Sequence, residues 1–417
     1  MKTKNIFYTA ICILTLNCSA QELIQDRDFQ QGFYVRDTVY PYSYFGPLIG
    51  DSSLPPPVWN TAEWGSKSSL RSISRTTLAS GFYQWADANK DFRFGPVGAE
   101  EYELYFGVNS QSEYDSIYRT PDQFWPHLLI EQRFSPPYDF PGQGPGCPSF
   151  SNLDSLIFQI DAKLLYNLTI MNAGYDPTYH AAQFLIYFTV QNSNPSSSGY
   201  GKYVWLGMQL YDDRFAIPPS GVSYDIGTET LINEIPYLDF ASVSTHNGAW
   251  VHAQIDLLPY ALAALDTAWT NGFLNESTDL ADYKIGGMNM GWELPGMNIS
   301  TVGVKGISLV AYQMTTGIGE EKNENDFSVN IYPNPSSGKI EVRSEKLEVK
   351  SVEIYNVLGE KIASSNSSSV GRGGFNSLPS GGQGWALDLS SQPSGIYFLN
   401  IKTDRQSIIQ KLLIHKI

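Results

Sequence analysis

Apolar and polar residues alternate in seven runs of the chain, and this period of two constrains the fold more than any other feature. Successive side chains of a strand point to opposite faces, so each run predicts a strand with one apolar face for a core. A single helical pattern spans 259–271, with Pro259 in its first turn. We therefore predict an all-β fold over residues 21–315, a large two-sheet β-jelly roll with one decorating helix. The seven runs are 127–134, 156–166, 181–192, 202–214, 250–257, 283–294 and 302–312.

The polar faces of these runs are rich in planar amides and aromatic rings. Rings stack on the apolar faces of pyranose sugars, and amides hydrogen-bond to sugar hydroxyls. We therefore expect a glycan-binding groove on this side of the sheet. The alternative is a second buried layer, in which loops or the helix cover the polar face. The residues expected to bind substrate are Gln183, Tyr187, Tyr203, Trp205, Gln209, Tyr211, Trp250, His252, Gln254 and Asn289.

Two carboxylates, Glu131 and Glu293, stand on polar faces among apolar neighbours. Glycosidases use one protonated and one ionised carboxyl group, and burial raises the pKa of a carboxyl group. These two residues are the expected catalytic pair of an endo-acting polysaccharide hydrolase. The alternative is that either one forms an ordinary ion pair with Arg133 or Lys163.

The sequence contains no catalytic constellation that identifies a reaction, so whether the protein is an enzyme stays open. Polysaccharide binding without chemistry is the main prediction, and the hydrolase is the alternative. A polysaccharide lyase on the same groove is a further alternative, because β-elimination needs a group that neutralises a carboxylate and a base. Its residues would be Arg133, Lys163, Gln183, Tyr187, His252 and Gln254.

Asp87, Asn89 and Asp91 have the oxygen spacing that opens a calcium-binding loop. Phe92 and Gly98 stand where an EF-hand needs glycine and glutamate, so the segment is no EF-hand. A looser structural calcium site and a polar turn are the two alternatives. We expect no other cofactor, because HExxH, P-loop, dinucleotide and Gly-x-Ser-x-Gly motifs are missing from the sequence.

Residues 1–20 have the pattern of a secretory signal, with a basic start, an apolar run and small residues before a cut after Ala20. Lipidation of Cys18 is the alternative. No other apolar run reaches the length of a membrane span, and Cys147 alone would remain, so no intramolecular disulfide is expected. The net charge of −15 argues against general binding to nucleic acid.

The C-terminal region follows a polar linker at 316–326 and alternates apolar with polar residues between Gly and Pro, which predicts a small β-sandwich. Its motifs are 329–338, 352–362, 387–390 and 394–401. Their order resembles the C-terminal sorting domain of type IX secretion cargo in the Bacteroidetes, over residues 327–417. The resemblance implies export by the type IX machinery, and then a protein that is secreted or attached at the outer cell surface. A Ser/Gly-rich insert at 363–385 departs from the pattern, and an ordinary β-sandwich appendage is the alternative.

Overall fold

The chain divides into two compact units, residues 1–316 and 317–417, which we describe separately. The computed structural model describes residues 19–36, 43–96, 101–137, 144–171, 174–314, 329–334, 336–344, 349–356, 361–364, 375–377, 384–403 and 407–414. Residues 1–18 of the expected signal, the linker at 316–326 and most of the insert at 363–385 lie outside these ranges. The predictions for those segments therefore stay predictions.

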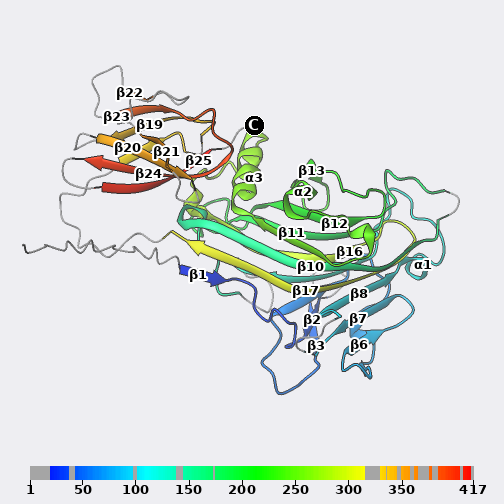
Figure 1. Cartoon of the computed structure of the whole chain (residues 1–417). Helices are drawn as coiled ribbons and strands as arrows, with labels where there is room; N and C mark the ends of the chain where they lie inside the picture. The colour runs from blue at the N-terminus through cyan, green and yellow to red at the C-terminus, as the bar shows by residue number, and fades with distance from the viewer. Residues whose placement is uncertain are drawn as a thin grey trace, which may run out of the picture. The chain divides into compact units, whose positions relative to one another are not determined.

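The first sheet of the body, sheet A, is antiparallel throughout, and β10 and β17 are the second and third strands from one edge (Figure 1). These two strands are long and run side by side across the body. Strand β1 adds to β17 beyond the main path of the sheet. In spatial order, the strands are β15 (Val251–Asp256), β10 (Leu153–Thr169), β17 (Asn298–Gln313), β8 (Leu104–Asn109), β7 (Lys90–Phe94), β6 (Tyr83–Ala86) and β5 (Thr76–Thr77), with β1 (Ser19–Glu22) on β17.

The second sheet, sheet B, is mixed, because β12 with β14 and β2 with β4 are parallel pairs. The remaining neighbours are antiparallel. In spatial order, the strands are β13 (Gly221–Asp225), β14 (Thr230–Glu234), β12 (Tyr203–Asp212), β11 (Gln183–Asn192), β16 (Tyr283–Glu293), β9 (His127–Arg133), β4 (Trp59–Ala62), β2 (Phe33–Arg36) and β3 (Tyr44–Leu48).

The apolar faces of the two sheets meet in one core. Phe158 of sheet A and Phe188 of sheet B pack edge to face, with ring centroids 5.0 Å apart. Trp292 of sheet B donates its indole N–H to the backbone oxygen of Phe106 in sheet A, at 3.2 Å. A fully buried ring of this size contributes about 1.5–3 kcal/mol of hydrophobic stabilisation. The predicted all-β, two-sheet fold is confirmed.

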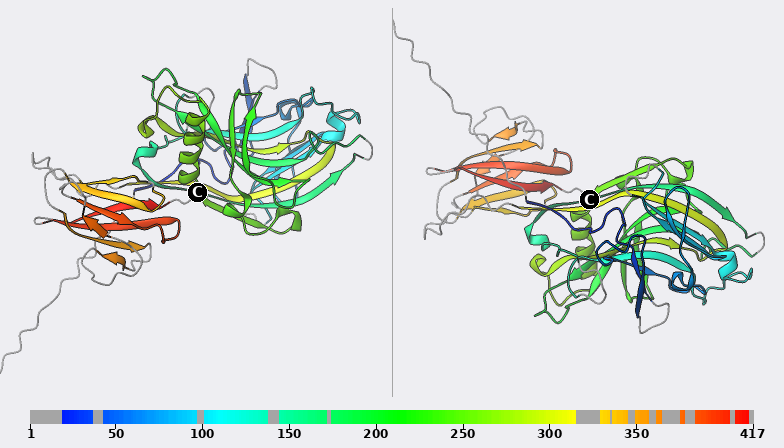
Figure 2. Two further views of the ribbon diagram at one scale, coloured as in Figure 1. Left: turned by 90° about the horizontal axis from the view of Figure 1, so that it is seen from above. Right: turned by 90° about the horizontal axis from the view of Figure 1, so that it is seen from below.

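Helix α3 (Leu258–Thr270) lies within one residue of the helix expected at 259–271. Its buried face, which includes Ala261, Ala264 and Leu265, joins the core of the body. Figure 2 shows the strands of the body from above and below, with this helix beside them. The described residues contain no helix long and apolar enough to span a membrane. The shorter helices are α1 (Ser110–Glu113) and α2 (Tyr237–Phe240), with 3-10 turns at Leu70–Ser72, Phe150–Asn152, Thr245–Asn247 and Leu280–Asp282.

The described residues of the C-terminal unit form two four-stranded sheets, as the alternation in its sequence predicts. Val342, Ile354, Leu399 and Leu412 are fully buried in its own core. One sheet is β18 (Val329–Tyr332), β19 (Lys339–Ser344), β23 (Gly384–Asp388) and β22 (Phe375–Ser377). The other is β21 (Lys361–Ser364), β20 (Val349–Asn356), β24 (Gly395–Thr403) and β25 (Ser407–Ile414).

Candidate functional site on the polar face of sheet B

Five neighbouring strands bring a row of residues together on the face of sheet B that points away from the core. Glu131 of β9 pairs with Asn289 of β16, which pairs with Tyr187 of β11. Tyr187 pairs in turn with Gly207 of β12, and Gly207 pairs with Glu234 of β14. The register therefore places two carboxyl groups, an amide and a phenol in one line across the sheet.

Gly207 allows the side chains on either side of it to close over β12. A Cβ atom there would lie 2.4 Å from Oε2 of Glu234 and 2.6 Å from the Tyr187 ring. The Tyr187 hydroxyl donates a hydrogen bond to Oε1 of Glu234, at 3.1 Å. Oε2 of Glu234 and Oε1 of Gln209 are buried and have no hydrogen-bond partner among the described residues. Neither atom is exposed to solvent, and the Gln209 side chain lies close enough to Glu234 to lower the pKa of that carboxyl group by hydrogen bonding.

Glu234 is partly protonated at neutral pH. Burial raises its pKa to about 7, and the charge of Glu293 acts in the same direction. Hydrogen bonding by the Gln209 side chain and by the Tyr187 hydroxyl opposes this shift only in part, because it stabilises the ionised form. Burial also raises the pKa of Tyr187 well above its usual value, so the phenol remains a donor.

Glu293, at the end of β16, is held in the ionised state. Burial alone would raise its pKa, but the charge and hydrogen bond of His127 and the indole N–H of Trp125 together lower it. Nε2 of His127 lies 3.5 Å from Oε2 of Glu293, and Nε1 of Trp125 donates to the same oxygen at 3.0 Å. The pKa of His127 is raised, because Glu293 outweighs the opposing effect of burial. Nδ1 of His127 carries a proton, since it faces the backbone oxygens of Trp64 and Trp125 at 3.0 and 2.9 Å.

The sequence-predicted pair Glu131 and Glu293 lies on adjacent strands but is widely separated along them. Glu293 lies four residues beyond Asn289 on β16, which at about 3.4 Å each places its Cα atom about 14 Å along the strands from the row that holds both Glu131 and Glu234. Glu131 is also bound by Arg36, whose Nη1 lies 3.0 Å from both carboxylate oxygens.

Aromatic rings lie beside this row on β11 and β12. The Trp205 ring lies 4.9 Å from the Tyr203 ring and 5.7 Å from the Tyr187 ring, and all three side chains are half-buried. The Trp205 indole N–H donates to Oγ1 of Thr228 in the turn between β13 and β14, at 3.0 Å. Gln183, nearer the end of β11, donates to Oδ2 of Asp212 at 2.8 Å. Of the predicted binding residues, the structure thus places Gln183, Tyr187, Tyr203, Trp205, Gln209 and Asn289 on this face.

Tyr211, which was expected on the polar face, lies in the core instead. It is 3% exposed, and its ring centroid is 5.8 Å from that of Trp292. The cause is a bulge, because Phe184 pairs with Tyr211 whereas the next residue, Leu185, pairs with Gln209. The extra residue in β12 reverses the alternation beyond it.

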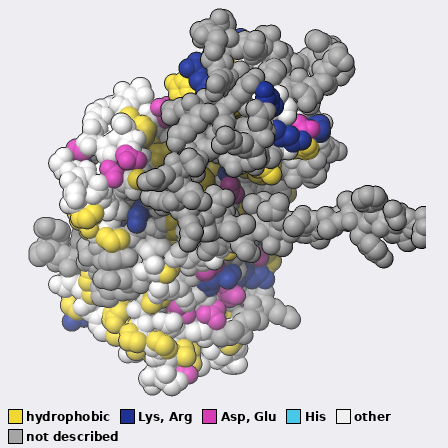
Figure 3. All heavy atoms as spheres, turned by 90° about the vertical axis from the view of Figure 1, so that its left-hand side faces the viewer, with side chains coloured by type: hydrophobic (Ala, Val, Ile, Leu, Met, Phe, Trp, Pro, Cys, Tyr) yellow, Lys and Arg dark blue, Asp and Glu magenta, His cyan; other side chains and the backbone are white. Residues whose placement is uncertain are grey.

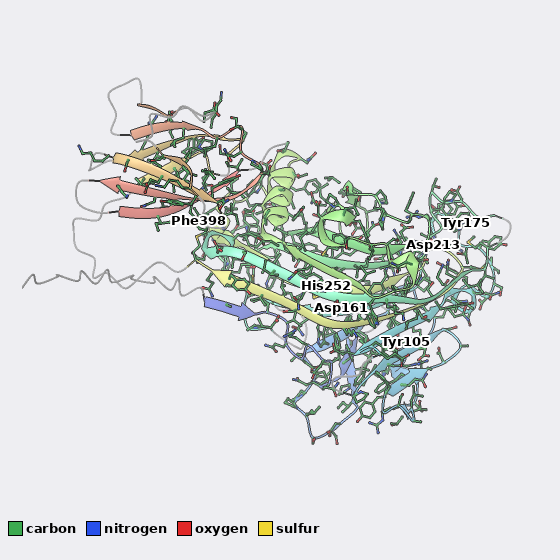
Figure 4. All side chains as sticks on the ribbon, in the orientation of Figure 1. Tyr105, Asp161, Tyr175, Asp213, His252 and Phe398 are labelled. Atoms are coloured by element: carbon green, nitrogen blue, oxygen red, sulfur yellow. The ribbon has the colours of Figure 1, made fainter. Side chains whose placement is uncertain are left out.

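Trp250, His252 and Gln254 belong to the other sheet. Strand β15 pairs with β10, so His252 stands opposite Asp161, and its Nδ1 donates a hydrogen bond to Oδ1 of Asp161 at 2.7 Å (Figure 4). Nζ of Lys305 lies 4.3 Å from the Trp250 ring centroid. These residues lie on the outer face of sheet A, and the expectation of a single groove is corrected accordingly.

The Asp87, Asn89 and Asp91 segment forms a polar hairpin turn between β6 and β7. Oδ1 of Asp87 accepts the backbone N–H groups of Asn89 and Lys90, at 2.7 and 2.8 Å. Asp91 forms an ion pair with Arg93 and accepts a hydrogen bond from Gln84 at 2.9 Å. No cluster of three or more His, Cys, Asp or Glu side chains suited to a metal occurs in the part of the chain that the structure describes.

Sequence reasoning missed Glu234, Trp125 and Arg36 as members of this face. Glu234 ends a strand of five residues, too short for a reliable period of two. Trp125 precedes its strand, and Arg36 comes from a strand far away along the chain. Figure 3 views the chain from the left-hand side of Figure 1, and the Lys and Arg side chains drawn there lie singly or in small groups, some of them beside Asp and Glu.

Comparisons with known proteins identify the C-terminal unit and give distant likenesses for the body. Residues 330–415 match the secretion system C-terminal sorting domain. No curated protein matches the sequence.

An endoglucanase from Rhodothermus marinus is 11% identical with a TM-score of 0.30, and the match covers 58% of this chain and 96% of the endoglucanase. A family 12 xyloglucanase from Bacillus licheniformis is 10% identical with a TM-score of 0.32, covering 57% and 97%. A family 11 xylanase from Neocallimastix patriciarum is 8% identical with a TM-score of 0.29, covering 57% and 95%. The resemblance to type IX sorting domains is thus confirmed, and the protein carries a type IX secretion sorting domain that sends it to the outer surface or the extracellular space.

Proposed function

We propose that the body is a polysaccharide hydrolase whose reacting groups are Glu234 and Glu293 on the polar face of sheet B. One observation carries the proposal. The same face holds a carboxyl group whose pKa is raised to about 7 and a carboxylate whose pKa is lowered. A protonated and an ionised carboxyl group are the two parts that glycoside hydrolysis requires.

In this proposal, neutral Glu234 donates its proton to the glycosidic oxygen as the bond to the anomeric carbon breaks. The electron pair of that bond goes to the leaving oxygen. Ionised Glu293 either attacks the anomeric carbon or takes a proton from the attacking water, and the separation of the two carboxyl groups decides which. Glu131, neutralised by Arg36, serves in the wall of the site. Trp205 and Tyr203 supply ring faces for sugars.

Glycan binding without chemistry is the second candidate. It is favoured by the pairing of both sequence-predicted carboxylates, Glu131 with Arg36 and Glu293 with His127. A binding protein would use the same rings and amides, and its Glu234 would only accept and donate hydrogen bonds. The two functions therefore differ in turnover rather than in which residues contact the glycan.

A reducing-end assay on mature protein tests the proposal, with β-glucan, xyloglucan, xylan and a uronic-acid polymer as substrates. We expect new reducing ends from at least one neutral glycan and loss of turnover, with retained binding, in Glu234→Gln and Glu293→Gln. An amide keeps most packing but cannot supply the proton or the negative charge. Binding without turnover by the wild type supports the second candidate. Unsaturated products from the uronic-acid polymer indicate the lyase, and both outcomes contradict the hydrolase.

A further inference from the structure

Arg119 is a buried cation that makes its hydrogen bonds to the backbone. The side chain is 4% exposed, and no ion pair joins it to a carboxylate among the described residues. Its Nε donates to the Pro295 oxygen at 3.1 Å and its Nη1 to the Gln123 oxygen at 2.8 Å. Further acceptors are the backbone oxygens of Thr120, Pro121 and Tyr179. One guanidinium thus fixes the segment 119–125, which has no regular secondary structure.

A second contact holds the backbone of Arg119 itself. Nε2 of His180 lies 2.9 Å from the Arg119 oxygen. The backbone N–H of Asp176 donates to Nδ1 of the same ring at 3.0 Å, so Nε2 carries the proton and donates to Arg119. The His180 side chain is 1% exposed. Burying a charged group and a polar ring is costly unless they are fully hydrogen-bonded, which indicates that a fixed loop conformation matters here.

Trp125 connects this loop to the proposed site. The Arg119 guanidinium lies 5.1 Å from the centre of the Trp125 ring, and the Tyr179 ring lies 5.6 Å from the same guanidinium. The indole N–H of Trp125 donates to Oε2 of Glu293 at 3.0 Å. A cation over the face of an indole draws electron density toward itself, which makes the N–H a stronger donor.

We propose that Arg119 is a positioning residue that acts through the indole of Trp125 to orient the Glu293 carboxylate. The inference rests on the proposed function only for the role of Glu293 in turnover, because the contacts themselves need no substrate. Arg119 fixes where the indole N–H points and strengthens it as a donor. The other titratable groups that act on Glu293 are His127 on β9, Glu234 on β14 and Tyr187 on β11.

The pH profile of kcat separates this role from a structural one. The proposed Glu293 must be ionised, so activity falls as pH drops through its pKa, and a weaker donor moves this acid limb to higher pH. We expect Trp125→Phe to move it upward by about one pH unit, a tenfold change in the ionisation equilibrium. Arg119→Met should move it in the same direction, with kcat changed more than KM. The double variant should match Trp125→Phe alone, since Arg119 acts through that ring.

A second measurement makes the inference testable without turnover. In protein labelled with 5-fluorotryptophan, the Trp125 fluorine resonance is the one missing from Trp125→Phe. Its shift should titrate with Glu293 in the wild type, lose that titration in Glu293→Gln, and titrate at higher pH in Arg119→Met. Arg93→Met is the matched control, because Arg93 lies 4.3 Å from the Tyr105 ring on sheet A. It should leave the midpoint unchanged.

The outcomes distinguish the inference from the proposed function. If the fluorine midpoint rises in Arg119→Met while the wild type cleaves no glycan, the inference stands and the hydrolase fails. If the wild type is active but Arg119→Met is folded with an unchanged midpoint and acid limb, the inference is overturned. Additive shifts in the double variant also overturn it. Should Arg119→Met fail to fold, Arg119→Lys replaces it, because lysine keeps the charge but not the fork, and an unmoved midpoint there counts against the inference.

Discussion

Burial of Glu234 sets the alkaline limit of the proposed activity, and the hydrogen bond from Tyr187 moves that limit to lower pH. Glu234 must be protonated to act as the acid, so turnover falls as pH rises through its pKa of about 7. The 3.1 Å bond from the Tyr187 hydroxyl stabilises the ionised form and lowers that pKa. Tyr187→Phe removes the hydroxyl but keeps the ring beside Trp205. The pKa of Glu234 should therefore rise and the alkaline limb should move to higher pH.

The size of this shift follows from the bond that is lost. Hydrogen bonds to charged groups contribute about 1.5–3 kcal/mol, and we use the lower end because the Gln209 side chain continues to stabilise the ionised form in this variant. At 1.36 kcal/mol per unit, the limb should move by about one pH unit. Initial rates of reducing-end release across the pH range measure it. Tyr224→Phe, on an exposed strand residue, is the control and should change nothing. An alkaline limb that stays in place or moves down in Tyr187→Phe would refute the reasoning.

Three further predictions concern binding and stability. Trp205→Ala should reduce the free energy of glycan binding by about 1–3 kcal/mol, measured by affinity electrophoresis in a gel that contains the glycan. It should change the melting temperature little, because Trp205 is half-buried. A large drop in melting temperature with unchanged glycan binding would contradict an open sugar-binding face. Tyr211→Ala should cost about 3–5 kcal/mol in urea unfolding and leave binding per folded molecule unchanged; a cost below about 1 kcal/mol would return Tyr211 to the polar face. The His127–Glu293 pair should stabilise the fold most between about pH 4.5 and 6.5. The contribution of Glu293 is present above its unfolded pKa and is lost as pH falls through its lowered folded pKa. The contribution of His127 is present below its unfolded pKa and is lost as pH rises through its raised folded pKa. A difference in unfolding free energy between wild type and Glu293→Gln that does not vary with pH would count against this pair.

The alternation of apolar and polar residues was sufficient to predict the fold. A half-buried strand needs this alternation, and the residues of the strand itself show which side faces the core. Leu206 and Met208 on β12 are buried as that phase predicts. The prediction fails at Tyr211, because the bulge depends on how β11 pairs with β12 and leaves no mark in the sequence. Helix α3 was predictable because Pro259 and its apolar spacing are also local.

The composition of the site was less predictable, because it depends on which sheet each strand joins. The run at 250–257 alternates as clearly as the run at 202–214, yet it pairs with β10 in sheet A, so its residues do not join the polar face of sheet B. Glu234 enters the site only through the parallel pairing of β12 with β14. Arg119 acts from an irregular loop, where no periodicity exists to suggest a role.

Hydrolysis in oxygen-18-labelled water, followed by mass spectrometry of the products, tests the central claim most directly. A hydrolase transfers one solvent oxygen to each new reducing end, whereas a lyase gives unsaturated ends without label and a binding protein gives no products. We predict singly labelled oligosaccharides from the wild type and none from Glu234→Gln at equal protein concentration and equal glycan binding. Unlabelled products, or labelled products formed equally by Glu234→Gln, would contradict the assignment of Glu234 as the acid of a polysaccharide hydrolase.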